Sequence, residues 1–378
     1  MKVGIIGAGQ LGRMLVMAGY PLGLRFEMFD PNPRACGAQV APLTTAAFDD
    51  WQALAALADR VDLVTFEFEN VPVATMEFLA ALVDVFPRPP VLKTAQDRLR
   101  EKECFRKLDI PTPDYLVVDR REDLTAAVAS LGLPAVLKTR CLGYDGKGQV
   151  ILRRPGDLDA AWTALGTAPL ILEALIPFER EVSLVAARGG DGGMAFYPLA
   201  ENTHRDGILR LSLACVADPM QLKAEEYTRR VLEHFAYVGV LAFEFFQVGD
   251  RLVANEIAPR VHNSGHWSIE GAETCQFANH LRAILGWPLG APDLWGQSAM
   301  INFIGELPPL APLLKYPYLH YHAYGKSPAP GRKVGHATLR LPSSANLPAA
   351  LADLFFQKDL GLEDLQLTVG EKKGIQPG

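Results

Sequence analysis

The sequence predicts a multidomain protein that joins an α/β region to an α+β region. Strand-like and helix-like segments alternate through residues 1–93, which is typical of a parallel sheet covered by helices. Over residues 134–259 the predicted strands are more frequent and are separated by glycine or polar turns. The 378 residues, of which 49% are hydrophobic, are enough to bury two or three separate cores.

The first region begins as a β-α-β unit. Residues 2–6, KVGII, predict a buried strand, and a glycine turn and a helix over residues 10–19 follow it. The remaining elements expected here are a strand over 24–30, a helix near 50–58, a strand over 61–69, a helix after Pro72 and a strand near 83–87. Strands that alternate with helices in this way predict a parallel sheet.

The later elements follow a different pattern. Thr94 is a candidate N-cap for a linking helix, which Pro111 and Pro113 would end. Helices are expected near residues 156–165 and 219–236. Beyond Trp287, a small β-rich module is indicated by strands over 298–305 and 316–325 and by a Gly/Pro-rich joint over 327–336.

Charge and cysteine content narrow the class of protein. A net charge of -6 argues against a surface that coats nucleic acid, because backbone binding needs clustered Lys and Arg. The five cysteines are scattered singly and form no CxxC pair, which favours a reduced, cytoplasmic protein. Gly7, Gly9, Gly12 and Arg13 interrupt the apolar start, so we expect neither a signal peptide nor a membrane partner.

A G-x-G-x-x-G motif, GAGQLG at residues 7–12, joins the first strand to the first helix. Its backbone N–H groups suit the pyrophosphate of a dinucleotide, another phosphate, or no ligand at all. Gln10 and Leu11 at the helix start are placed to meet a ribose phosphate, whereas a dinucleotide would use Asp30 for its ribose. Glu67 and Glu69 follow another strand at the same edge, where each is either a ribose ligand or a solvated acid.

A second glycine-rich stretch, KTRCLGYDGKGQ at residues 138–149, lies between two predicted strands. Such a loop can fold over a phosphate chain, with backbone N–H groups and Lys147 compensating the charge, or it can be a mobile hairpin. Lys138 ends the preceding strand. The stretch is not a Walker A motif, because it lacks the G-K-[ST] ending and the helix that follows it.

Four acids lie in or beside the central strands. Glu173 and Glu181 are placed to accept hydrogen bonds from an adenine amino group or ribose hydroxyls, whereas a lone Glu at such a position is usually a surface residue. Glu244 and Glu256 lie within apolar strands, Glu256 directly after Asn255, and burying two carboxylates is costly unless a cation lies between them. Oxygen ligands suit Mg²⁺, although Arg or Lys partners across the sheet would also compensate the charge.

The loop APRVHNSGHW follows these strands. Its Arg260 and His262 are placed to bind a small planar oxyanion beside a phosphate. His204, in the stretch ENTHRDGILR, either contacts nucleotide phosphate or caps a turn. Zinc is disfavoured, because His262 and His266 have no thiolate companion.

The order of these motifs resembles that of ATP-grasp ligases. Within that superfamily, the strings GAGQLGRM, TFEFENVP, GYDGKGQ, NTHRDGIL, PRVHNSGHW and GRKVGH together resemble the 5-(carboxyamino)imidazole ribonucleotide synthase family of purine biosynthesis. The match runs from residue 3 to about residue 341, and roughly the last forty residues show no motif that we can match.

The resemblance implies an ATP-grasp fold of three domains. These are a Rossmann-like pre-ATP-grasp domain over 1–93, an ATP-grasp region over 94–290 and a small β-rich C-terminal domain over 291–378. A small subdomain over about 110–172 and a larger sheet over about 173–290 would enclose ATP. Two Mg²⁺ ions, bicarbonate, aminoimidazole ribonucleotide and a homodimer are also implied.

Carried over residue by residue, the resemblance implies three groups of contacts. ATP would contact Arg98, Lys138, Gly143, Tyr144, Asp145, Gly146, Lys147, Gly148, Gln149, Glu173, Ala174, Leu175, Ile176, Glu181, His204, Asn255 and Glu256. The ribonucleotide would contact Gln10, Leu11, Glu67, Tyr144, Asp145, Lys333 and Arg340. Mg²⁺ would be held by Glu244 and Glu256.

The implied catalytic residues are Arg260, His262, Lys147 and Asp145. Arg260 and His262 would hold bicarbonate and then carboxyphosphate, and Lys147 would neutralise charge. Asp145 would steer or accept the amine proton, or would hold a ribose or a backbone N–H. The glycine loop would also exclude water as a lid.

The implied activity is ATP-dependent carboxylation of the ribonucleotide amine through carboxyphosphate. A formate-dependent glycinamide ribonucleotide transformylase would share the same nucleotide machinery. An NAD-dependent dehydrogenase rests only on GAGQLG and Asp30. A non-catalytic nucleotide sensor would leave Glu244 and Glu256 without a purpose.

Overall fold

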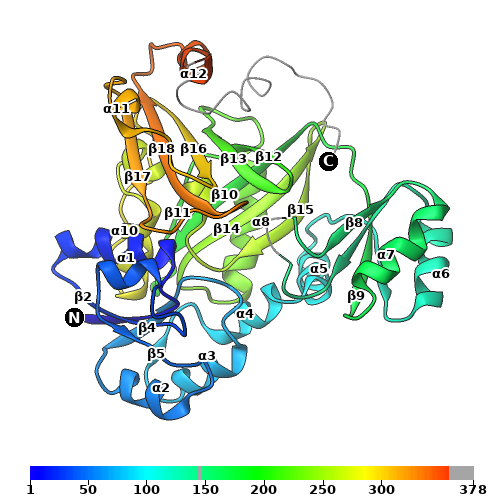
Figure 1. The fold of residues 1–378 in the computed structure, drawn as a ribbon, viewed down its shortest axis with the longest axis horizontal. Coiled ribbons are helices and arrows are strands. Elements are labelled where there is room, and N and C mark those ends of the chain that lie inside the picture. Colours follow the sequence, from blue (N-terminus) through cyan, green and yellow to red (C-terminus); the bar gives the residue numbers. More distant parts are fainter. Residues whose placement is uncertain (144–145, 357–378) are drawn as a thin grey trace.

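The computed structural model describes residues 1–143 and 146–356, whose strands form three sheets (Figure 1). A five-stranded sheet and a four-stranded sheet lie on different sides of a nine-stranded central sheet. The combination of a parallel sheet with two antiparallel sheets confirms the predicted mixture of α/β and α+β architecture.

The N-terminal sheet is parallel, with strand order β3-β2-β1-β4-β5, as the alternation of elements predicted. Its interior strands are buried on both faces: all four residues of β4 are buried. The strands are β1 (Lys2–Ile6), β2 (Arg25–Phe29), β3 (Leu43–Thr44), β4 (Leu63–Phe66) and β5 (Asp84–Val85). The helical segments around them are α1 (Gln10–Gly19), η1 (Tyr20–Leu22), η2 (Cys36–Gln39), α2 (Trp51–Ala58) and α3 (Val73–Ala80).

Two helices, α4 (Pro89–Ala95) and α5 (Arg98–Lys107), link this sheet to the rest of the chain. The predicted N-cap at Thr94 is wrong, because prolines at the start of α4 begin a separate helix that contains Thr94. The N-cap of α5 is Asp97, whose side chain accepts a hydrogen bond from Leu99 N at 2.9 Å.

The four-stranded sheet is antiparallel, with order β6-β9-β7-β8, and forms the lobe at the right of Figure 1. Its apolar core includes residues of α6 and α7, which pack against the strands. The strands are β6 (Tyr115–Val118), β7 (Ala135–Thr139), β8 (Gln149–Leu152) and β9 (Leu170–Ala174). The helical segments are α6 (Arg121–Leu131), η3 (Pro155–Asp157) and α7 (Leu158–Leu165).

The nine-stranded sheet has the order β15-β14-β10-β12-β13-β16-β18-β17, and β11 pairs with β10. The β16–β18 strands, which the sequence predicted as a separate module, continue the central sheet through pairing of β13 with β16. The first strands are β10 (Arg180–Arg188), β11 (Met194–Phe196), β12 (Ala200–Arg205), β13 (Ile208–Ala214) and β14 (Gly239–Val248). The others are β15 (Arg251–Ala258), β16 (Gln297–Ile304), β17 (Leu319–Ala323) and β18 (Lys333–Leu341).

One continuous apolar core joins the N-terminal sheet to the central sheet. It contains residues of α1, α10 and β14, with Leu15, Leu281 and Val240 among those that are 0% exposed. This packing holds the carboxyl edge of the parallel sheet beside the central strands. The remaining helical segments are α8 (Gln221–His234), η4 (Asn263–Gly265), α9 (Ser268–Gly271), α10 (Gln276–Ile284), α11 (Leu310–Leu313) and α12 (Leu347–Phe356).

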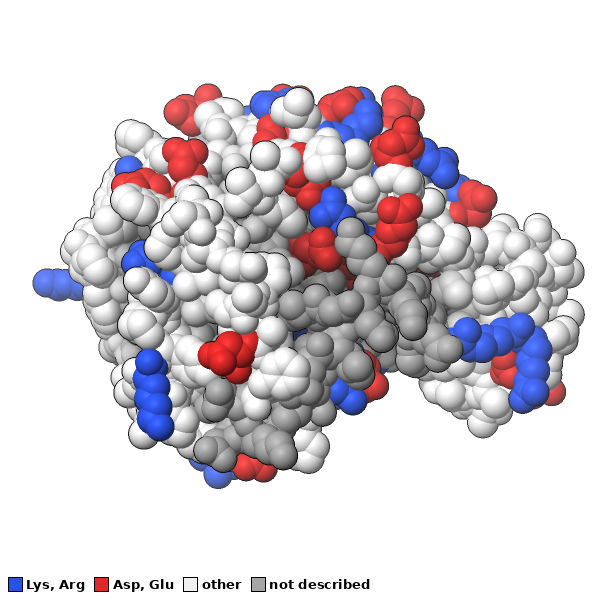
Figure 2. Space-filling view, turned by 90° about the horizontal axis from the view of Figure 1, so that it is seen from above, with Lys and Arg blue, Asp and Glu red and all other residues white. Residues whose placement is uncertain are grey.

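The surface in Figure 2 carries acidic and basic side chains interspersed over its upper part. All five cysteines are free thiols. Among the helices in the described ranges, none combines the length and the apolar character that crossing a membrane requires.

Candidate active site

The small sheet positions a buried ion pair beside the glycine-rich hairpin. Lys138 on β7 donates from Nζ to Glu173 Oε2 on β9 at 2.9 Å. A second ammonium group, Lys102 Nζ of α5, lies 3.3 Å from Glu173 Oε1. Burial by itself raises the pKa of the Glu173 carboxyl, but Lys138 and Lys102 outweigh it and lower that pKa to about 2. Glu173 is therefore a firmly ionised carboxylate between two cations.

The glycine-rich stretch forms a hairpin between β7 and β8, in which Lys138 pairs with Gln149. Tyr144 and Asp145 lie outside the described residues. On one side of the hairpin, a Cβ added to Gly143 would lie 3.3 Å from Arg98 Nη2, and on the other, one added to Gly146 would lie 2.9 Å from Gly207 Cα. The hairpin therefore packs closely against both α5 and the β12–β13 turn.

The other predicted nucleotide contacts lie around this hairpin. Gly148 has a φ of +73°, which glycine adopts without strain, and Lys147 and Gln149 are exposed. At the end of β9, Ala174 N donates to Asp114 O at 2.8 Å and the next residue, Leu175, donates from N to Pro134 O at 3.3 Å. These two N–H groups are engaged by the chain itself, and Ile176 follows them in the link to β10.

Two carboxylates face each other on neighbouring central strands. Glu244 of β14 pairs in register with Glu256 of β15, and Asn255 is the extra residue of a β-bulge beside them. Burial and the negative charge of Glu256 raise the pKa of Glu244 to about 7. The predicted burial is met only in part by Glu244, whose side chain is 16% exposed, and is wrong for Glu256, whose side chain is 40% exposed because it lines the pocket.

Both carboxylates have partners on the chain. Glu256 Oε2 accepts a hydrogen bond from Arg98 Nη1 at 2.8 Å, and Glu244 Oε1 lies 3.4 Å from His262 Nε2. Basic partners, the alternative to a metal, are thus present in this structure. The pair nevertheless fits a divalent cation, because the two carboxylates face each other in register and both burial and the charge of Glu256 raise the pKa of Glu244. A divalent cation between them would relieve this unfavourable pairing.

Arg260 and His262 lie in the same pocket as the two carboxylates. Arg260 Nε pairs with Glu69 in the turn that follows β4, so the N-terminal domain contributes to the pocket. Burial lowers the pKa of His262 well below its usual value, and the charges of Arg260 and Lys333 lower it further. At neutral pH, His262 is therefore an uncharged imidazole.

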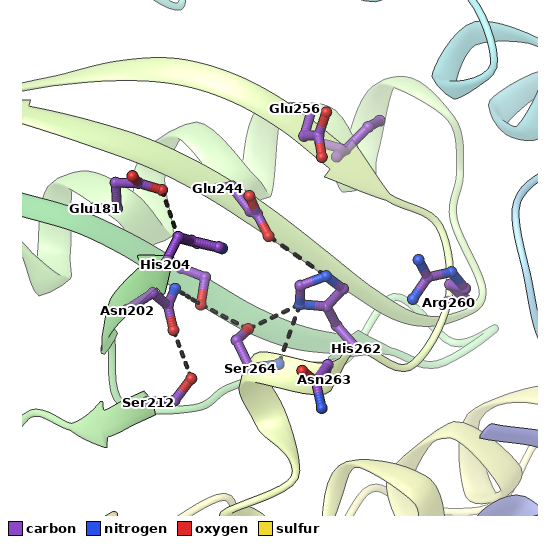
Figure 3. A network of polar contacts seen from close by, with 12 residues as sticks. Glu181, Asn202, His204, Ser212, Glu244, Glu256, Arg260, His262, Asn263 and Ser264 are labelled. Atoms are coloured by element: carbon purple, nitrogen blue, oxygen red, sulfur yellow. Dashed lines mark hydrogen bonds and ion pairs between the residues drawn. The ribbon is translucent and has the colours of Figure 1, made fainter. Parts of the chain in front are cut away.

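A line of polar side chains reaches His262 from the sheet (Figure 3). His262 Nδ1 lies 2.9 Å from Ser264 Oγ, which accepts a hydrogen bond from Ser183 Oγ at 2.7 Å. Beside this line, His204 Nδ1 lies 2.9 Å from Glu181 Oε2. Burial lowers the pKa of His204, but the neighbouring Glu181 carboxylate outweighs it and the net pKa is raised. The structure thus brings the predicted residues Glu181 and His204 into direct contact.

The glycine turn at residues 7–12 binds carboxylates of the chain itself. Glu67 accepts hydrogen bonds from Gly9 N at 2.9 Å and Gly12 N at 3.1 Å, and Asp30 accepts one from Ala8 N at 2.8 Å. The parallel pairing of β1 with β4 places Glu67 at the N-terminus of α1, where the helix dipole favours negative charge. A substrate anion could reach these two N–H groups only by displacing Glu67.

The predicted ribonucleotide contacts are divided between the N-terminal domain and strand β18 of the central sheet. Gln10 is partly exposed at the start of α1, whereas Leu11 is 6% exposed and belongs to the apolar core. A bulge in β18 places Lys333 on the same face as Arg340. Their Cα atoms are about 20 Å apart by strand rise, so one ligand would meet both only if their side chains extended toward each other.

Two residues of the pocket region were missed in the sequence. Glu101 is 1% exposed and accepts a hydrogen bond from Ile257 N at 2.8 Å, and burial together with Glu256 raises its pKa to about 8. Lys102, on the same helix, is 0% exposed. One face of α5 carries Arg98, Glu101, Lys102 and the buried Phe105 at helical spacing. This pattern in the sequence would have predicted that Glu101 and Lys102 point inward.

Comparison with known proteins agrees with this geometry. Residues 103–277 match the ATP-grasp domain family, residues 1–96 match the ribonucleotide synthetase preATP-grasp domain, and residues 298–349 match the phosphoribosylaminoimidazole carboxylase C-terminal domain. The fold and the site therefore define an ATP-grasp ligase.

Similarity to whole proteins narrows the class. The chain is 56% identical to N5-carboxyaminoimidazole ribonucleotide synthase of Pseudomonas aeruginosa over 94% of this chain and 98% of that protein. The crystal structure of the synthetase from Thermus thermophilus matches with a TM-score of 0.89 and 54% identity, over 93% of this chain and 97% of that one. The Aspergillus clavatus enzyme in complex with ADP and 5-aminoimidazole ribonucleotide matches with a TM-score of 0.87 and 31% identity, over 96% of this chain and 98% of that one. The chain belongs to the N5-carboxyaminoimidazole ribonucleotide synthase family, which confirms the resemblance in the motifs.

Proposed function

We propose that this protein carboxylates the amine of 5-aminoimidazole ribonucleotide with bicarbonate, converting ATP to ADP and phosphate. The product is 5-(carboxyamino)imidazole ribonucleotide, an intermediate of purine synthesis. The observation that carries the proposal is one pocket in which Arg98, Glu244, Glu256, Arg260 and His262 meet. That pocket combines carboxylates for a metal–nucleotide complex with a guanidinium and an imidazole for a small oxyanion.

The chemistry needs an activated carbonate. Bicarbonate is a poor electrophile, because its carbon bears a charged oxygen and no good leaving group. Transfer of the γ-phosphoryl group of ATP to a bicarbonate oxygen gives carboxyphosphate and ADP, so that phosphate can later leave. The ribonucleotide amine then forms the new C–N bond by attacking this species or the carbon dioxide that it releases, and the amine loses a proton.

The protein supplies position and charge for these steps. Arg260 and His262 would orient bicarbonate, and Lys138 and Lys147 would compensate nucleotide phosphate charge. Glu244 and Glu256 would hold Mg²⁺, which neutralises phosphate charge when it is bound. For Arg260 to bind bicarbonate it must share or release Glu69, with which it is paired in this structure.

The ribonucleotide site is proposed at the boundary between the N-terminal sheet and the central sheet. Gln10 begins α1 and Glu67 follows β4 at the edge of the N-terminal sheet, whereas Lys333 and Arg340 lie on β18 of the central sheet. The ribonucleotide complex of the Aspergillus clavatus relative supports this substrate. The roles of Tyr144 and Asp145, and the glycine hairpin as a lid, stay predictions; the close packing of Gly146 against Gly207 supports the lid.

An assay of ADP release tests the proposal and separates its rivals. We expect release with ATP, Mg²⁺ and bicarbonate that depends on aminoimidazole ribonucleotide and yields the carbamate product. Turnover with formate and glycinamide ribonucleotide instead would assign the chain to the transformylase reaction. Binding of NADH without any ADP release would favour a dehydrogenase, and binding of ATP without turnover would favour a sensor.

The domain boundaries at residues 93 and 290, a homodimeric state and a cytoplasmic location are proposals that rest on the resemblance to the family. Light scattering of the purified protein tests the dimer, which requires about twice the 41.2 kDa mass of the chain.

A further inference from the structure

Five polar side chains form a line of hydrogen bonds from the interior of the central sheet toward the pocket (Figure 3). The line runs through Ser212, Asn202, Ser183, Ser264 and His262, and the carboxylate of Glu244 lies beyond its end as the ion-pair neighbour of His262. The three serines are at most 1% exposed and Asn202 is 7% exposed. Because water hardly reaches them, these side chains must serve as hydrogen-bond partners for one another. Each hydroxyl or amide therefore donates toward the pocket, in the same direction along the line.

Ser212, at the inner end of the line, sets the direction in which the hydrogen bonds are donated. Ser212 Oγ donates to Asn202 Oδ1 at 2.7 Å, which turns the amide so that Nδ2 donates to Ser183 Oγ at 2.9 Å. A hydroxyl has one proton, and Ser183 donates its proton to Ser264 Oγ at 2.7 Å. Ser264 therefore accepts from Ser183 and has its own proton left to donate.

The proton of Ser264 is directed at one nitrogen of His262. Ser264 Oγ lies 2.9 Å from His262 Nδ1, and the backbone N–H of Ser264 donates to the same nitrogen at 3.3 Å. Two donors that converge on Nδ1 require a lone pair there, so the imidazole proton is on Nε2. Nε2 lies 3.4 Å from Glu244 Oε1 in the pocket.

We infer that Ser212, Asn202 and Ser183 are positioning residues that hold His262 as its Nε2–H tautomer, so that it is a hydrogen-bond donor to anionic oxygen. In this state His262 cannot act as a base through Nε2. The catalytic consequence rests on the proposed function, because the oxygens of bicarbonate and carboxyphosphate need donors. The tautomer itself is a property of the resting protein.

Nitrogen NMR of the resting protein tests the tautomer. In protein labelled with ¹⁵N-histidine, long-range ¹H–¹⁵N spectra distinguish the protonated ring nitrogen from the lone-pair nitrogen for each of the eight histidines. The His262→Gln spectrum assigns the signals of His262. We expect a lone pair on Nδ1 and a proton on Nε2; a proton on Nδ1 in the wild-type protein would overturn the inference.

Asn202→Asp is designed to reverse the direction of hydrogen-bond donation between Ser183 and Ser264. A carboxylate only accepts, so it draws the Ser183 proton toward itself, and Ser264 then donates to Ser183. An oxygen lone pair would face His262 Nδ1, and we expect the Nδ1–H form to increase. Ser212→Ala frees the Asn202 amide to turn, and we expect a smaller increase of the same form.

Ser298→Ala is the matched control. Ser298 is a fully buried serine on β16 of the same sheet, and its Oγ has no hydrogen-bond partner among the described residues. We expect its spectrum and activity to match the wild type. If neither Asn202→Asp nor Ser212→Ala changes the tautomer, the positioning role is wrong. If Asn202→Asp does not fold, the wild-type spectrum still tests the tautomer of His262 and the Ser212→Ala spectrum still tests the positioning role.

Kinetics test the consequence for the reaction. We expect Asn202→Asp to lower kcat for bicarbonate-dependent ADP release about tenfold, the worth of one hydrogen bond, and to leave the KM for ATP unchanged. An equal rise in the KM for ATP would indicate general damage and would contradict a role confined to His262. If the wild type shows no bicarbonate-dependent release, the proposed function fails, while the spectra still decide the tautomer.

Discussion

Glu244 and Glu256 lie opposite each other on β14 and β15, with a bulge residue, Asn255, beside them. The bulge turns Glu256 to the face of Glu244, where a regular strand would have placed Asn255. Burial and, after it, the negative charge of Glu256 raise the pKa of Glu244, so the two carboxylates are unfavourable neighbours in the resting protein. The arrangement suits a site that gains a cation together with its substrate.

Glu256→Gln tests the cation site. The amide keeps the shape of the side chain but removes its charge, so we expect bicarbonate-dependent ADP release to fall below detection while the protein stays folded. ADP release and circular dichroism are the measurements. Glu233→Gln, at an exposed position of α8, is the control that should keep full activity. Undiminished ADP release by Glu256→Gln would remove Glu256 from the metal site.

Lys102→Met tests the buried pair with Glu173. Lys138 still compensates Glu173 in this variant, so we expect a loss of unfolding free energy below the ~3–5 kcal/mol of a fully broken buried pair, together with a higher KM for ATP. Denaturant unfolding and steady-state kinetics are the measurements. Lys107→Met, at an exposed position of the same helix, should change neither quantity. An unchanged KM for ATP in Lys102→Met would make Lys102 purely structural.

Glu173 predicts a pH dependence of stability. Its folded pKa of about 2 lies below the unfolded value, so its contribution is present above the unfolded pKa and is lost as pH falls toward about 2. The full contribution is about 3 kcal/mol, since one pKa unit corresponds to about 1.4 kcal/mol. The unfolding free energy of Glu173→Gln should therefore fall less steeply than that of the wild type between about pH 5 and pH 3. Parallel slopes would show that Glu173 is not held ionised.

Lys333→Ala tests the ribonucleotide site. We expect the KM for aminoimidazole ribonucleotide to rise roughly tenfold or more, which corresponds to the loss of one charge-assisted hydrogen bond, and the KM for ATP to change little. Arg332→Ala changes the exposed residue that directly precedes β18 and serves as the control. Equal increases in both KM values would place Lys333 outside the substrate phosphate site.

Much of the fold was predictable because its signals are local. The alternation of strands and helices in residues 1–93 predicted a parallel sheet, and the strand boundaries of β1 and β16 agree with the predicted ones within one residue. The N-cap of α5 was not predicted, because Thr94 and Asp97 are both good caps and only the prolines at the start of α4 separate two helices there. The join of β13 to β16 was not predicted either, since strand pairing over long sequence distances leaves no local pattern.

The sequence by itself determined the family, because the glycine loops, the strand acids and the PRVHNSGHW string occur together and in a fixed order. That combination is specific to the family, whereas each motif alone is not. Only the tertiary structure decided which charges meet. Glu67 binds the N–H groups of α1, Glu69 pairs with Arg260, and Lys102 lies beside Glu173. The physical reason is that such contacts depend on register, bulges and the packing of distant elements, where a displacement of one residue turns a side chain to the opposite face.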